Sequence, residues 1–163
     1  PLPAAHGFPA RLIVPGLYGY VSATKWLSEI ELTTWDGFDA YWVPRGWAKE
    51  APIKTQSRID LPRSGRTVPV GPVDVAGVAW APLKGVAAVE VSVDGEGLVQ
   101  CVLTEPLSSR AWVQWRASVD LTAGEHTVSV RAMDGTGQTQ TADRVPPRPD
   151  GATGHHTIRI VAA

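Results

Sequence analysis

The chain has 163 residues and a formal net charge of −1, with 44% hydrophobic and 19% charged residues. This composition is unlike that of a disordered chain, and the near-neutral charge provides no basic field of the kind that nucleic-acid binding uses. No apolar run approaches the about twenty residues that span a bilayer, and one cysteine excludes an internal disulfide framework.

The first segment with chemical content runs from His6 to Gly16, and a Lys25-Trp26 pair follows it. Four glycine and proline residues interrupt this stretch before Tyr18, so the backbone can fold back on itself. His6, Arg11 and Lys25 then bring up to three positive donors toward one anion. Proteins hold phosphate in this way, and the pattern favours a phosphate site.

The first sixty residues differ in character from the rest of the chain. Nine of the twelve aromatic residues lie before residue 51, separated by glycines and prolines. We expect short strands at Ala10–Val14 and Leu27–Leu32 and an aromatic loop at Trp35–Trp47. These elements do not make a self-sufficient core, and much of their surface is expected to be apolar and uncovered.

From Val68 onward, short alternating runs bounded by Gly, Pro and Asp recur about every ten residues, which is typical of a β-sandwich. About seven strands are expected. The candidates are Val73–Trp80, Val89–Val93, Leu98–Leu103, Ala111–Val119, Glu125–Ala132 and Thr157–Ala162, with a first strand near Arg58–Leu61 or Thr67–Val70.

Within this region Trp115 shares a strand face with valines and is predicted to lie in the core. Cys101 lies in an apolar run, where a lone cysteine is most often a small buried hydrophobe. The proline-rich segment Val145–Gly151 lacks ladder donors and is expected to be a long connection, exposed or lying across an edge.

The run from His6 to Gly16, together with Lys25-Trp26, resembles the sulfite oxidase family of molybdenum-cofactor oxidoreductases. In that family an HGFP-x-R run ending in V-P-G, followed by a K-W pair, closes the cofactor domain. The resemblance continues through phrases of the family's second domain, which have counterparts at Gly77–Trp80, Val89–Gly95, Trp112–Trp115 and Val130–Asp134.

This resemblance implies that molybdopterin and its phosphate are contacted by His6, Arg11, Ala23, Thr24 and Lys25. It implies a mainly β fold, in which residues 1–60 finish a partial α+β cofactor domain and residues 61–163 form an immunoglobulin-like (E-set) dimerisation domain. The implied partners are the upstream cofactor domain of the same protein, a second copy in a homodimer, and a small oxyanion or oxide substrate.

The family's molybdenum-binding cysteine lies upstream of the HGFP run, whereas Cys101 lies in the second domain. Because no initiator Met precedes Pro1, we expect a C-terminal fragment without a metal ligand or a catalytic residue of its own. The fragment alone is expected to hold no cofactor and to be inactive. The compartment is not identified, because a signal peptide or membrane anchor would lie before Pro1.

Animal sulfite oxidases carry an arginine between two tryptophans of this second domain, and Val113 occupies the aligned position here. Arg110 and Arg116 are the nearest candidates to take its place. The departure leaves the substrate open, although the reaction class depends mainly on the cofactor.

Two other functions deserve a test. A non-catalytic immunoglobulin-like binding module would use Trp42 and Trp47, with Tyr41 beside them, as an exposed platform for a carbohydrate or a protein. A heme-linked electron-transfer role has no supporting motif. His155 and His156 leave opposite faces of a strand and cannot chelate one metal, and no HExxH, paired CxxC, P-loop or GxSxG pattern occurs.

Overall fold

The chain forms two units, and the boundary between them is crossed more than once along the sequence. The structure is a computed structural model that describes residues 1–163. The first unit comprises Pro1–Ile53 and Pro146–Ala152, and the second comprises Lys54–Val145 and Thr153–Ala163. The late segment Pro146–Ala152 therefore belongs to the unit that begins the chain.

The second unit consists mainly of strands, whereas the first consists mainly of short turns and loops. The first unit contains η1 (Ala4–His6), β1 (Leu12–Ile13), α1 (Gly19–Ser22), β2 (Ala23–Thr24) and η2 (Val43–Arg45). The second contains β3 (Gln56–Leu61), β4 (Thr67–Val68), β5 (Gly71–Trp80), β6 (Val86–Val93), β7 (Glu96–Gln100), β8 (Val102–Leu103), β9 (Val113–Leu121), β10 (Gly124–Asp134) and β11 (His156–Ala162).

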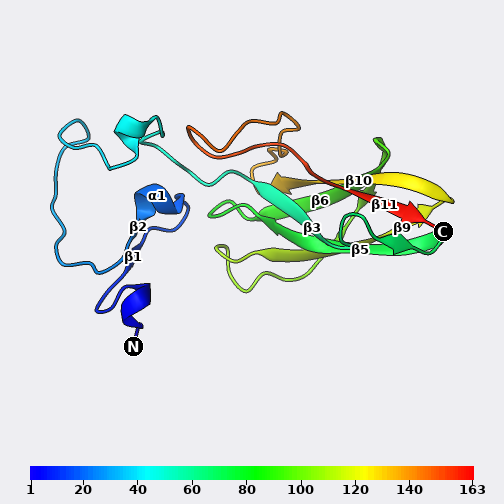
Figure 1. Ribbon diagram of the computed structural model, residues 1–163, viewed down its shortest axis with the longest axis horizontal. Coiled ribbons are helices and arrows are strands. Elements are labelled where there is room, and N and C mark those ends of the chain that lie inside the picture. Colours follow the sequence, from blue (N-terminus) through cyan, green and yellow to red (C-terminus); the bar gives the residue numbers. More distant parts are fainter. The chain divides into compact units, whose positions relative to one another are not determined.

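The second unit is a sandwich of two sheets. One sheet has the order β4-β11-β10-β6-β7 and the other has the order β3-β5-β9-β8. Neighbouring strands are antiparallel, except that β4 runs parallel to β11. Figure 1 shows the two sheets as two layers, with β10, β11 and β6 in one and β5, β9 and β3 in the other.

Alternation of side chains builds the core of the sandwich. In β9 every second residue from Val113 to Leu121 is buried, whereas the residues between them are exposed. Trp115 is 2% exposed, which confirms its predicted place in the core. Valines of β5, β6 and β10 face it from the other strands.

The sandwich differs from the sequence prediction in strand number. It contains nine strands rather than about seven, because both candidate first strands are present and the run Leu98–Leu103 is divided. At Cys101 the chain leaves β7, on the edge of the five-stranded sheet, and enters β8, on the edge of the four-stranded sheet. Alternation of side chains does not reveal such a change of sheet.

In the first unit the strand expected at Ala10–Val14 is confirmed over two residues, but the strand expected at Leu27–Leu32 is wrong. The partner of β1 is β2. Trp26 follows with φ of 53° and turns the chain out of the ladder. After Leu27 donates to the Ala10 carbonyl at 3.0 Å, the pairing stops.

The segment Val145–Gly151 forms a connection without a regular strand, as its prolines predict. Within the first unit, the Pro149 carbonyl accepts hydrogen bonds from Ala48 N at 2.9 Å and from Tyr20 Oη at 3.2 Å.

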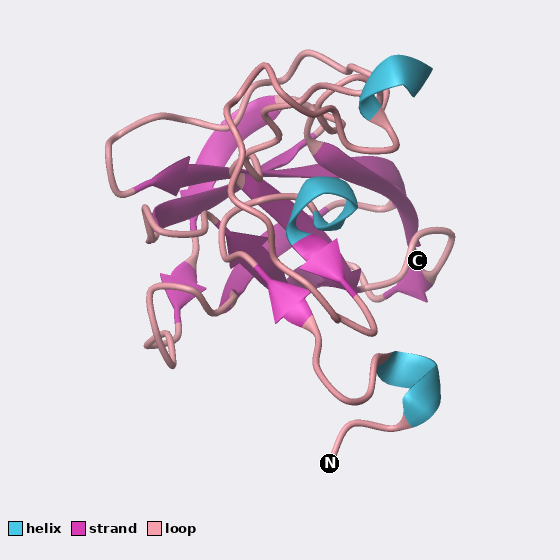
Figure 2. Cartoon of the chain, turned by 90° about the vertical axis from the view of Figure 1, so that its left-hand side faces the viewer, coloured by secondary structure: helices cyan, strands magenta, loops and turns pink.

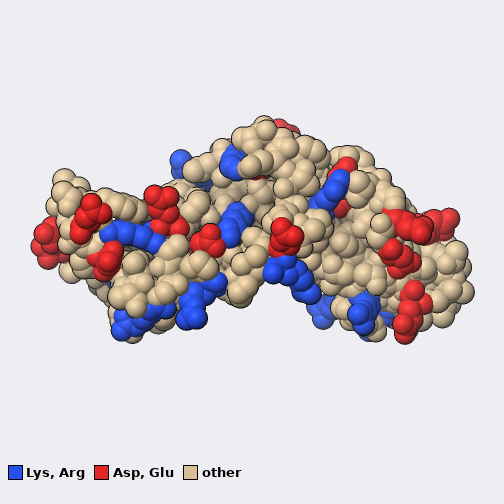
Figure 3. Space-filling model, turned by 90° about the horizontal axis from the view of Figure 1, so that it is seen from above, with Lys and Arg blue, Asp and Glu red and all other residues tan.

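None of the helical segments has the length and hydrophobicity that a bilayer crossing requires, and all are short (Figure 2). Basic and acidic side chains are interspersed on the face shown in Figure 3.

Candidate functional site

The β1–β2 ladder of the first unit brings Arg11 and Lys25 together. Leu12 pairs with Thr24, so the next position outward places Arg11 opposite Lys25. Cross-strand partners carry Cβ atoms about 4.5–5.5 Å apart. The side chains of two residues that are fourteen positions apart in the sequence therefore start next to each other.

Gly7 packs against both Arg11 and Lys25. Its φ is 113°, a left-handed conformation that favours glycine. A Cβ atom added at Gly7 would lie 3.3 Å from Arg11 Cβ and 3.3 Å from both Lys25 Cα and Cβ. The peptide that carries His6 therefore packs closely against both cationic residues. We call this group of His6, Gly7, Arg11 and Lys25 the cationic cradle.

Two hydrogen bonds hold the turn that precedes Gly7. Lys25 Nζ donates to Ala5 O at 3.2 Å, and Trp26 Nε1 donates to Ala4 O at 2.7 Å. Lys25 Nζ also lies 5.6 Å from the centroid of the Trp26 ring. The pair Lys25-Trp26 thus fixes the position of η1, a structural role that sequence reasoning missed although the pair itself was noticed.

The cradle is positively charged and has donors free to bind an anion. The Arg11 and His6 side chains make no hydrogen bond or ion pair with the rest of the chain, and both residues are exposed. No Asp or Glu occurs before Glu29. Carboxylates of this stretch therefore do not compete for the donors.

The remaining predicted site residues lie on β2. Ala23 and Lys25 share one side of the backbone, whereas the Thr24 side chain leaves the other side. Thr24 therefore does not join the cradle through its hydroxyl. The residue that sequence reasoning did not single out is Gly7, and its place inside the HGFP run was the available signal.

The histidines of the second unit do not gather into a group of metal-ligating side chains. No group of three His, Cys, Asp or Glu side chains is placed to hold a metal ion. His155 Nε2 lies 3.0 Å from Gln140 O, whereas His156 Nδ1 accepts from Ile59 N at 3.0 Å. The two adjacent histidines thus have separate partners, with His156 at the start of β11 and His155 just before it.

Cys101 is a buried cysteine, as predicted. It is 6% exposed, and burial, together with the charge of Glu90, raises the pKa of its thiol to about 12. The thiolate form that metals bind is therefore strongly disfavoured.

Two tryptophans of the sandwich, Trp80 and Trp112, lie next to each other. The Trp80 and Trp112 rings lie 6.1 Å apart, and Trp80 Nε1 donates to Arg110 O at 3.0 Å. Arg58 approaches the Trp112 ring to 5.6 Å. Val113 is 3% exposed, so the position aligned with the family's arginine contributes to the core instead.

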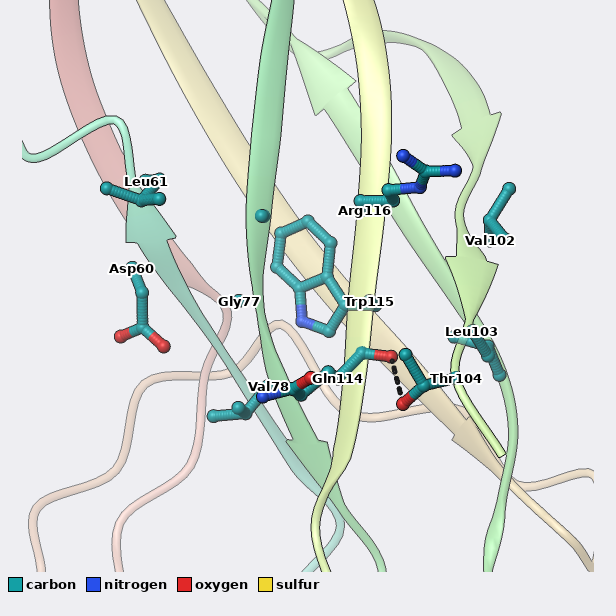
Figure 4. Close-up of a pocket in the computed structure, with 11 residues that line it drawn as sticks. Asp60, Leu61, Gly77, Val78, Val102, Leu103, Thr104, Gln114, Trp115 and Arg116 are labelled. Carbon is teal, nitrogen blue, oxygen red and sulfur yellow. Dashed lines mark hydrogen bonds between the residues drawn. The ribbon is translucent and has the colours of Figure 1, made fainter. Parts of the chain in front are cut away.

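Arg116 lines a cavity of about 550 Å³ over the four-stranded sheet. Figure 4 shows this cavity, with Asp60 and Leu61 on one side and Val102 and Arg116 on the other. Of the two arginines near Val113, Arg116 therefore faces a hollow of the sandwich. Arg110 lies on an exposed loop.

The aromatic cluster around η2 is poorly shaped as a carbohydrate platform. The Tyr41 and Trp42 rings are perpendicular, with centroids 5.0 Å apart, and Trp42 and Trp47 meet at 66°. The Arg45 guanidinium lies 3.6 Å from the Tyr41 centroid and covers one ring face. These side chains stabilise one another and do not present coplanar faces to a sugar.

Known proteins resemble the chain along most of its length. Residues 1–42 match the family model of the oxidoreductase molybdopterin binding domain, and residues 56–130 match that of a bacterial Ig domain. The mitochondrial sulfite oxidase of Homo sapiens is 30% identical over 160 residues, covering 82% of this chain and 29% of that protein. Sulfite oxidase of Gallus gallus is also 30% identical over 160 residues, covering 82% of this chain and 34% of that protein.

A solved structure agrees with these relatives. The sulfane dehydrogenase SoxCD from Paracoccus pantotrophus superposes with a TM-score of 0.68 at 26% identity, covering 93% of this chain and 43% of that chain. The chain belongs to the sulfite oxidase family of molybdopterin oxidoreductases. It spans about a third or less of the length of the curated sulfite oxidases cited above.

The cationic cradle has the chemistry of a phosphate site. A phosphate requires several positive donors and no competing carboxylate, and His6, Arg11 and Lys25 meet both conditions. At Gly7, the absence of a side chain keeps the backbone close to the two cations. The immunoglobulin-like sandwich of this family member is the fold that the alternating strands predict.

Proposed function

We propose that this chain is the C-terminal part of a molybdopterin-dependent oxidoreductase and that its cationic cradle binds the pterin phosphate. In this proposal the first unit, Pro1–Ile53 with Pro146–Ala152, completes the cofactor domain, and the sandwich forms a dimerisation domain. The sandwich begins at Lys54, before β3, and not at residue 61 as the sequence predicted. The observation that carries the proposal is the convergence of Arg11 and Lys25 on Gly7 in an acid-free segment.

Each cradle residue has a distinct part in this binding. Arg11 offers a planar fork of N–H donors to the phosphate oxygens, and Lys25 adds a point charge beside it. His6 donates one ring N–H from the turn that Lys25 and Trp26 hold in place. Ala23 and Thr24 contribute through the backbone of β2. When bound, the cofactor supplies two-electron oxygen-atom transfer.

The chain alone is proposed to be catalytically inactive. Its one cysteine is buried with a raised pKa, so the thiolate ligand of molybdenum has to come from the upstream cofactor domain. That domain is also the proposed source of most of the pocket for a small oxyanion or oxide. Two copies of the complete protein are proposed to associate through the sandwich as a symmetric dimer.

Elemental mass spectrometry of the longer natural protein tests the proposal. Near-stoichiometric molybdenum and phosphorus are expected in the wild-type protein. Arg11→Gln and Lys25→Gln should each lower both contents, because each removes a charge-assisted hydrogen bond of about 1.5–3 kcal/mol. Arg110→Gln, on an exposed loop, is the matched control and should leave both unchanged. No molybdenum in the wild-type protein would refute the proposal.

A further inference from the structure

The loop after β3 carries an arginine at each end of one tight turn. Arg66 N donates to Arg63 O at 3.2 Å, and Gly65 has φ of 79°, as the third residue of a type II turn requires. In such a turn the Cα atoms of the first and fourth residues lie within about 7 Å. The side chains of Arg63 and Arg66 therefore begin close to each other.

Strand β11 holds this turn in place. Gly65 N donates to Arg159 O at 2.7 Å, and Val161 N donates to Arg66 O at 3.1 Å. Ser64 Oγ accepts from Arg159 N at 3.2 Å. The backbone between the two arginines is thus fixed by a neighbouring strand, so little ordering is needed when a ligand binds.

The turn borders an open hollow on the surface, where exposed side chains have unused donors. A cavity of about 550 Å³ is lined by Leu61, Pro62, Arg63, Arg66, Thr67 and Val68. The guanidinium groups of Arg63 and Arg66 make no ion pair. The Thr67 hydroxyl likewise makes no hydrogen bond with the protein, so three side chains can donate into the hollow.

The segments that form and hold the turn carry more positive than negative charge, with Asp60 before Leu61 and Glu125 opposite Val161 as the neighbouring carboxylates. No Asp or Glu occurs from Leu61 to Val73 or from His156 to Ala163. Arg159, whose backbone contacts Ser64 and Gly65, adds a third positive charge nearby. Like charges that lie close together repel one another, and a multiply charged anion would reduce that repulsion.

We propose that the hollow between Arg63 and Arg66 binds a free, doubly charged tetrahedral oxyanion, for which inorganic phosphate is the probe. The two guanidinium groups donate N–H bonds to different oxygens of the anion, and the Thr67 hydroxyl donates to a third. This site shares no residue with the cationic cradle and stands independently of the proposed function.

The test is a ¹⁵N NMR titration of the 163-residue chain with sodium phosphate near neutral pH, compared with sodium chloride at equal ionic strength. Phosphate should shift the amides of residues 63–67 with saturation, whereas chloride should not. Arg63→Gln and Arg66→Gln should each weaken binding at least about tenfold, the change expected when one charge-assisted hydrogen bond is lost.

The matched control is Arg110→Gln, which removes an exposed arginine far along the sequence from this turn and should titrate like the wild type. Because the readout is resolved by residue, phosphate bound at Arg11 would shift other amides and would not be confused with this site. Equal shifts in phosphate and chloride would overturn the proposal, as would wild-type affinity in both Arg63→Gln and Arg66→Gln.

Discussion

Asp134 shows how one buried carboxylate organises its surroundings. It is 1% exposed and accepts hydrogen bonds from Lys84 Nζ at 3.0 Å, Thr55 Oγ1 at 3.1 Å and the backbone N–H groups of Thr136 and Gln138. Burial acts to raise the pKa of Asp134, but the hydrogen bonds from Thr136 and Lys84 outweigh it and hold the pKa well below its ordinary range.

Asp134→Asn should therefore lower the free energy of unfolding by about 2 kcal/mol near neutral pH, because it removes a charged acceptor from buried donors. The folded-state pKa is depressed, so the stabilisation is present above about pH 4 and is lost as the pH falls further. Urea denaturation at several pH values should show that the difference in free energy of unfolding between Asp134→Asn and the wild type shrinks as the pH falls. Asp60→Asn, which removes one partner of an exposed ion pair, is the control and should have little effect on stability. A stability difference for Asp134→Asn that does not change with pH would contradict the prediction.

His126 is expected to make stability depend on pH in the opposite direction to Asp134. Its ring lies 2.8 Å from Thr122 O and 2.7 Å from Asp94 Oδ2, and these two interactions raise the pKa of His126, the first more than the second. A raised folded-state pKa stabilises the protein below the ordinary value of about 6.5, and this stabilisation is lost as the pH rises through the folded value.

His126→Gln should accordingly lower the Tm most below about pH 6.5 and progressively less at higher pH. Thermal unfolding of both proteins across neutral pH measures the difference. A Tm difference that grows with pH would show that the neutral ring makes the important contacts. His156→Gln is a poor control, because burial lowers the pKa of His156.

At the scale of the strand, Gly77 of β5 is required by the close approach of β3. A Cβ atom at this position would lie 1.9 Å from Arg58 O and 2.8 Å from Trp115 Cζ2. Gly77→Ala should destabilise the sandwich by about 3 kcal/mol, at the upper end for overpacking. Gly19→Ala, where the nearest atom is 4.0 Å away, should be nearly neutral. Chemical denaturation that showed equal stability for both variants would disprove the clash.

Alternating side chains made most of the sandwich predictable. The valines of β6 and β10 and the alternation through Trp115 gave strands whose ends differ from the observed ones by a few residues. The division of the chain at Cys101 was missed, because a strand that changes sheets keeps its apolar pattern. Pairing order and register depend on contacts distant in sequence, which periodicity does not contain.

The candidate site was less accessible to sequence reasoning. His6, Arg11 and Lys25 were found because cationic residues near turn-forming residues suggest an anion site, and the family resemblance added Ala23 and Thr24. The packing of Gly7 against both was not predicted, since it depends on the β1–β2 register. The turn from Arg63 to Arg66 was missed because two arginines in a polar loop look like ordinary surface residues.

For the molecule as a whole, stability should be unequal between the units. The first unit has two strands of two residues and three helical segments of three or four residues, whereas the second has a continuous apolar core. Hydrogen exchange measured by mass spectrometry should therefore show faster exchange in Pro1–Ile53 than in β5, β9 and β10. Equal protection would indicate that the first unit has stabilising contacts equal to those of the core.

The segment Pro146–Ala152 has a consequence for the order of synthesis. Ala48 and Tyr20 of the first unit use the Pro149 carbonyl as their acceptor, yet Pro149 lies more than a hundred positions after Ala48 and 129 after Tyr20 on the growing chain. During translation Pro1–Ile53 leaves the ribosome before Pro146–Ala152, the last segment of the same unit, has been synthesised. It therefore completes its contacts only after most of the sandwich has been made, contrary to the usual N-terminal-first order.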